Sequence, residues 1–136
     1  MNHTLVSRVA AQARREDRGA LTLGYVAALP FLFLFVMVIV QASFWFLARE
    51  AALAAARQGA DAARALGASQ AAGTAAALAF ARQAGRGYLD HPAASSVGCT
   101  ARTVSVTVTG LAPSLLPGLT VAVSETVHAP AEEFRP

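Results

Sequence analysis

The chain has little that could support catalysis or an internal cross-link. Its 136 residues include a single cysteine, Cys99, so neither an intramolecular disulfide nor a zinc site built from several cysteines can form. The histidines His3, His91 and His128 are far apart in sequence, and no glycine-rich phosphate loop is present. Asp90 and His91 are adjacent, but no motif places a nucleophile beside them. We therefore expect no enzyme, no cofactor and no metal.

Lysine is absent, and all eleven basic residues are arginine. They are scattered and have no aromatic residues between them, which argues against nucleic-acid binding. The formal net charge of +3 fits a membrane flank together with solvated helix faces. Cys99 has two interpretations: a bridge to another subunit in an oxidising compartment, or a small buried hydrophobe beside a strand. The second is the more common situation.

Charge is also missing from one long stretch. Residues 19–48 contain no Asp, Glu, Lys, Arg or His, and about 20 apolar residues are enough to span a bilayer as a helix. Pro30 lies inside this run, where it predicts a kink or a tolerated membrane proline. Phe44, Trp45 and Phe46 are typical of an aromatic belt at the outer membrane interface.

Three interpretations fit this apolar run. A cleavable secretory signal has an apolar core of about 7–15 residues, roughly half of what is present. A signal-anchor keeps its helix, and four arginines before the run against three after it slightly favour a cytoplasmic N-terminus. A prepilin-type leader is cut after a glycine directly before the apolar helix. Gly19, which follows the charged residues 14–18, occupies that place and supplies an unhindered backbone.

The helical pattern continues beyond the run to about Leu66, with Gly67 as the predicted C-cap. Arg57 and Asp61 form a predicted i,i+4 pair on its charged face. The other faces are mostly alanine, which favours helix and lets a neighbouring helix approach closely. The expected organisation is a basic cytoplasmic leader (residues 1–19), a transmembrane helix (residues 20–47) and an extracytoplasmic part (residues 48–136).

A second helix is predicted after this one. Ser69 can act as its N-cap, and the pattern runs to about Ala84. Leu78 is its largest clear apolar anchor, and Gly73 weakens the pattern. Residues 85–98 are predicted to be a loop.

The last third of the chain changes period. Val104, Val106 and Val108 alternate with threonine and serine, which predicts a half-buried strand. After the turn-rich stretch "LAPSLLPG" a second alternation runs through Leu119, Val121 and Val123. The two runs predict an antiparallel hairpin, which needs the helices or another subunit for stability. The fold class is therefore α+β, with a long N-terminal transmembrane helix, a second short helix and a small C-terminal β-hairpin or sheet.

The stretch "RGALTLGYVAALPFLFLFVMVIVQASFWFLAREAALAAARQGADAAR" resembles the TadE-like pseudopilins of the tight-adherence (Flp) pilus system. The segments "VTVTG", "LLPG" and "FRP" are similar to actinobacterial members. The resemblance implies a pilin-like fold, a structural role in the pilus, and packing against other pilins through the N-terminal helix. It also implies that a prepilin peptidase removes the leader between Gly19 and Ala20.

The family usually has a glutamate at the fifth mature position, where this chain has Gly24, followed by the expected Tyr25. A carboxylate inside the membrane is costly unless a cation pairs with it, and the natural partner is a neighbour's new α-amino group. Gly24 cannot form this pair, so we expect a minor pseudopilin and not the repeating subunit. The alternatives are an uncleaved single-pass scaffold or binding subunit of a secretion system and, more remotely, a membrane-tethered enzyme.

Overall fold

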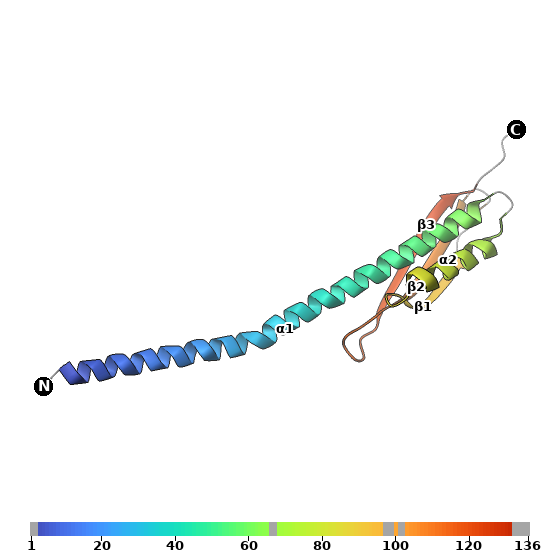
Figure 1. Cartoon of the computed structure of the whole chain (residues 1–136). Coiled ribbons are helices and arrows are strands. Elements are labelled where there is room, and N and C mark those ends of the chain that lie inside the picture. The colour runs from blue at the N-terminus through green and yellow to red at the C-terminus, as the bar shows by residue number, and fades with distance from the viewer. Residues whose placement is uncertain (1–2, 66–67, 97–99, 101–102, 132–136) are drawn as a thin grey trace. The chain divides into compact units, whose positions relative to one another are not determined.

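The computed structural model describes residues 3–65, 68–96, 100 and 103–131, with side chains from Gly24 onward. The chain divides into two compact units, Met1–Ile39 and Val40–Pro136; the second is termed the head. Helix α1 belongs to both units, whereas the other elements lie in the head (Figure 1). The elements in chain order are α1 (His3–Arg64), α2 (Gln70–Ala84), β1 (Asp90–Ser96), β2 (Thr103–Ala112) and β3 (Val121–Pro130). The predicted α+β class is confirmed.

Helix α1 continues without interruption through the charged residues 14–18, the apolar run and the alanine-rich extension. It passes through Gly19 and Pro30, and Pro30 removes one backbone hydrogen bond from its interior. The kink at Pro30 stays a prediction. The helix ends at Arg64, close to the predicted end at Leu66, and Gly67 lies outside the described residues.

The three strands form one antiparallel sheet in the order β1-β2-β3. Strands β2 and β3 pair without a register shift from Thr103↔Pro130 to Ala112↔Val121, which confirms the predicted hairpin. The alternation in β2 is also confirmed, because Val104, Val106 and Val108 are buried, although Ser105 is buried as well. The predicted position of Leu119 is wrong: β3 begins only at Val121, and Leu119 lies in the connecting loop, 44% exposed.

The prediction of a loop over residues 85–98 is wrong for its second half, where β1 pairs with β2. Strand β1 is an edge strand, and an edge is where a sheet tolerates a proline such as Pro92. Its pairing shifts between Asp90 and Ala93, so the strand carries an irregularity that a strict alternation pattern does not anticipate. The sequence of β1 alone therefore does not predict its pairing with β2.

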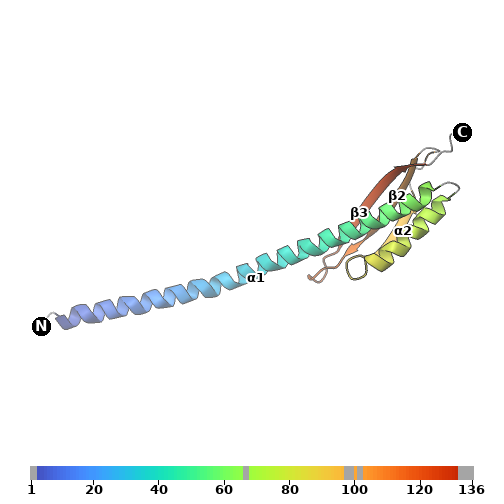
Figure 2. The ribbon, with the colours of Figure 1, turned by 45° about the horizontal axis from the view of Figure 1, so that its top comes forward.

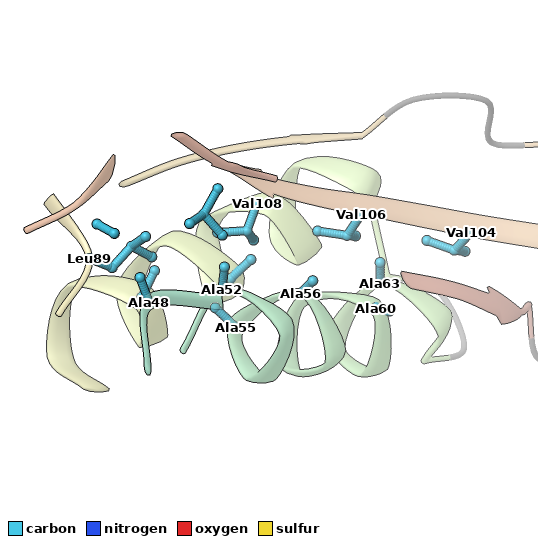
Figure 3. Packing of buried hydrophobic residues seen from close by; sticks show 14 residues of the cluster. Ala48, Ala52, Ala55, Ala56, Ala60, Ala63, Leu89, Val104, Val106 and Val108 are labelled. Carbon is cyan, nitrogen blue, oxygen red and sulfur yellow. The ribbon is translucent and has the colours of Figure 1, made fainter. Parts of the chain in front are cut away.

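The core lies between the sheet and the two helices, which cover the same face of it (Figure 2). Figure 3 shows the alanine row of α1 facing the valine row of β2. Among the residues that the structure describes, the largest fully buried side chains are Val106, Val108 and Ser105, so the helices approach the sheet closely. The core is therefore built mainly from alanine and valine. The buried alanines of α1 are Ala48, Ala52, Ala55, Ala56, Ala60 and Ala63.

Helix α2 begins as predicted: the Ser69 hydroxyl accepts a hydrogen bond from the Ala72 amide at 3.1 Å. The prediction that Leu78 anchors it is wrong, because its buried positions are Gly73, Ala77 and Ala81. A helix that packs through its smallest residues can lie closer to its neighbour than one that packs through leucine. Gly73, whose low helix propensity weakened the predicted pattern, is one of these buried packing positions.

The predicted ion pair on α1 is also corrected. Asp61 pairs with Arg64, one turn along the helix, with 3.0 Å between Oδ1 of Asp61 and Nε of Arg64. Both side chains are largely exposed, and such i,i+3 pairs contribute only a few tenths of a kcal/mol, about 0.2–0.5.

Candidate functional site: the apolar helix and its junction with the head

The first unit presents a large apolar surface along α1. Eleven large apolar side chains between Tyr25 and Ile39 are 48–74% exposed. By length and composition, the described part of α1 from Gly24 onward qualifies as a helix that can cross a membrane. Leaving so much contiguous apolar surface in water is unfavourable. This single long apolar N-terminal helix indicates membrane anchoring.

The residues of the predicted leader cleavage all lie along this helix. Gly19 and Ala20 are in the helical backbone of α1, outside the part with described side chains. A Cβ on Gly24 would meet no atom within 4 Å, so this position is open on the helix surface. Tyr25 is the most exposed large apolar residue, at 74%. The cleavage itself stays a prediction.

The predicted aromatic belt lies where α1 enters the head. Phe44 is half-buried, while Trp45 and Phe46 are 40% and 55% exposed. The guanidinium of Arg49 lies 5.8 Å from the centroid of the Trp45 ring, within the range of a cation–π contact. An amphipathic ring beside a cation suits the polar headgroup region of a bilayer.

Arg49 also ties α1 to the sheet. Its Nε lies 2.6 Å from Oε1 of Glu125, which is on β3 and has a side chain only 18% exposed. Arg49 therefore contacts both the aromatic belt and the last strand of the sheet.

A second polar link lies about two turns earlier in α1. The Gln41 Nε2 donates to the carbonyl oxygen of Pro113 at 3.2 Å, and its Oε1 accepts from the Leu115 amide at 3.1 Å. Both ends of the side-chain amide are thus satisfied by the backbone of the β2–β3 loop, residues 113–120. An amide in an apolar run is costly unless it is bonded in this way.

Sequence reasoning missed Gln41, Arg49 and Glu125 as joining residues. A signal existed for Gln41, since it is the one amide in the uncharged run of residues 19–48. Arg49 is the first charge after that run. Nothing local indicates Glu125 as its partner, because the two are 76 positions apart.

The His, Cys, Asp and Glu side chains of the described residues are scattered. Within that part of the chain no three His, Cys, Asp or Glu side chains gather into a metal site. Asp90 and His91 are exposed at the start of β1, beside an open cavity of about 320 Å³ bordered by the β2–β3 loop. Cys99 lies outside the described residues. The arrangement is suited to packing against apolar partners.

Among the comparisons with known proteins, one gave a match. The family model of the TadE-like proteins matches residues 19–61, beginning at Gly19 and covering the apolar run and most of the alanine-rich extension. No curated protein and no solved structure matches the chain.

The match confirms the resemblance predicted from the sequence: the chain is TadE-like over this segment. The TadE-like family consists of structural and assembly components of pili and is not an enzyme family. Proteins of this family are associated with the membrane and with other components of the tight-adherence pilus.

Proposed function

We propose that the protein is a minor pseudopilin of a tight-adherence pilus. Its helix is anchored in the cytoplasmic membrane with the N-terminus inside and the head outside, and it packs against the helices of other pilins. The leader, residues 1–19, is removed by a prepilin peptidase; residues 20–47 span the membrane, and residues 48–136 face outward until the subunit enters a pilus.

The observation that carries this proposal is where the family match begins. It starts at Gly19, the glycine that separates the charged leader from the apolar run. The exposed side chains between Tyr25 and Ile39 supply a surface that lipid covers before assembly and neighbouring helices cover afterwards. Glycine in a helix interior costs about 1 kcal/mol relative to alanine, so α1 opens more easily at Gly19 than at its neighbours.

The minor role is supported by Gly24. A carboxylate at this position could pair with the α-amino group of an adjacent subunit, and glycine offers no such group. The chain can still pack against other pilins through its apolar face. It lacks the charge pair that would position each newly added copy against its neighbour. An initiator, tip or adaptor subunit fits these properties better than a repeating subunit.

Replacing Gly19 by leucine tests the proposal. The Gly19→Leu chain should keep its leader and remain integrated in the membrane, resisting alkaline extraction. Ala27→Leu, a similar change within the apolar run, is the matched control and should be processed normally. Mature product of normal size from Gly19→Leu would contradict the proposal. If all variants and the unmodified chain keep the leader, the chain is the uncleaved single-pass scaffold or binding subunit instead.

A further inference from the structure

The β2–β3 loop exposes three leucines that the core does not use. Leu115, Leu116 and Leu119 are 46%, 53% and 44% exposed. No charged residue occurs between Arg102 and Glu125, so nothing in the loop opposes an apolar environment. The β2–β3 loop is therefore an uncharged, apolar and exposed part of the head, and is termed the tip.

The loop is held in this conformation by its own hydrogen bonds. The Ser114 hydroxyl donates to the Leu116 carbonyl oxygen at 3.1 Å and accepts from the Leu116 amide at 3.2 Å. The Leu119 amide donates to the Leu116 carbonyl oxygen at 3.2 Å, and Gly118 takes a φ of 83° that favours glycine. The leucines are thus presented outward by a defined turn.

The hydrogen bonds of Gln41 show which part of α1 lies beside this tip. The side-chain amide binds the backbone at Pro113 and Leu115, and Gln41 precedes Phe44 by three residues, about 4.5 Å along a helix axis. Phe44–Phe46 mark the predicted outer interface of the membrane. The loop therefore reaches the depth of the aromatic belt or passes below it, where exposed leucines would meet lipid and not water.

The neighbouring turn has the composition of an interfacial segment. Tyr88 is 42% exposed and Arg86 is exposed, and both lie in the turn between α2 and β1. Asp90 pairs with Leu111 at the end of β2, which places this turn beside the loop. An amphipathic ring and a cation suit the headgroup region of a bilayer.

From these contacts we propose that the β2–β3 loop is a second membrane contact of the protein. Leu115, Leu116 and Leu119 insert into the boundary between headgroups and acyl chains of the same bilayer leaflet from which α1 emerges. The inference rests on the membrane anchoring in the proposed function, and not on leader cleavage. It gives the head a fixed orientation on the bilayer, with the β2–β3 loop and the α2–β1 turn facing the lipid.

Depth-dependent fluorescence quenching tests this proposal on the full chain in phospholipid vesicles. In a Cys99→Ser background, single cysteines carry an environment-sensitive fluorophore at Leu116→Cys, at Leu29→Cys in the apolar helix, and at Gln70→Cys at the start of α2. Each label is exposed to iodide in the buffer and to lipids brominated along the acyl chain. Because all three native side chains are exposed or largely exposed, the substitutions leave the fold intact.

The label at 116 should be quenched by brominated lipid, with a ratio of lipid to iodide quenching several-fold above that at 70. Quenching at 116 by iodide alone would overturn the proposal, and so would protection from both quenchers, which indicates coverage by a second copy. Lipid quenching at 29 but not at 116 means that anchoring holds and the loop contact is wrong. Absence of lipid quenching at both 29 and 116 means that membrane anchoring itself is wrong.

Discussion

Gly59 of α1 and Gly73 of α2 face each other where the two helices pack. A Cβ on either residue would lie 2.8 Å from the backbone carbonyl oxygen of the other. Neither oxygen can move without disturbing its own helix. The pair therefore sets the spacing of α1 and α2, and so the depth at which both helices lie on β2.

Gly59→Ala should destabilise the head. The new methyl would also lie 2.6 Å from the Cβ of Ala77 and 3.0 Å from Cγ1 of Val106. Overpacking costs about 1–3 kcal/mol, and contacts this short, one of them to a backbone oxygen, favour the upper part of that range, so the cost should exceed the gain in helix propensity of about 1 kcal/mol. Denaturant unfolding of the full chain in detergent micelles measures the effect. Gln58→Ala, the exposed neighbour, is the control and should change little; a more stable Gly59→Ala would contradict the close packing.

Ser69→Ala should lower the free energy of unfolding by about 1 kcal/mol, because the Ala72 amide loses the hydroxyl that caps it. The same unfolding measurement applies. Ser69→Asp keeps a capping oxygen and should restore most of the loss. Equal stability of the alanine and aspartate variants would mean that the cap contributes nothing.

The ion pair between Arg49 and Glu125 should contribute modestly, since the Arg49 side chain is 48% exposed. A double-mutant cycle with Arg49→Gln and Glu125→Gln should give a coupling free energy of about 0.2–1 kcal/mol. The coupling should shrink as salt is added, because screening weakens exposed charge pairs. A coupling that is zero at low salt would show that the pair does not join the helix to β3 in solution.

Gly24→Glu should improve leader processing or entry into the pilus. The position is open, so the side chain fits without a clash, and its carboxylate can pair with a neighbouring α-amino group. The fraction of mature protein in sheared pili, compared with the membrane fraction, measures this. Gly24→Gln has the same size without the charge and should not improve it. If the two variants behave alike, the charge pair plays no part in processing or in entry into the pilus.

The parts of the fold that were predictable carry strong local signals. The uncharged run and its alanine extension predict α1, Ser69 predicts the start of α2, and the valine alternation predicts β2. Strand β1 was missed because its structure depends on the edge of β2, and Pro92 makes its own sequence look like a loop. Leu78 was misjudged because α2 packs through its smallest residues. The need for small residues follows from the close approach of Gly59 and Gly73, which are on different helices.

The joining residues of the candidate site were less predictable for a related reason. Arg49 and Glu125 are far apart in sequence, and only the antiparallel path of β3 brings them to 2.6 Å. The apolar surface between Tyr25 and Ile39 was predictable because the uncharged run in the sequence is enough to indicate it.

The central claim is that the chain is processed as a prepilin. Intact mass and N-terminal sequencing of the protein recovered from its native membrane test this claim most directly. The account predicts a mature chain that begins at Ala20, without the leader. A chain that begins at Met1 would contradict it, and the protein would then be a TadE-like membrane anchor that is not processed at Gly19.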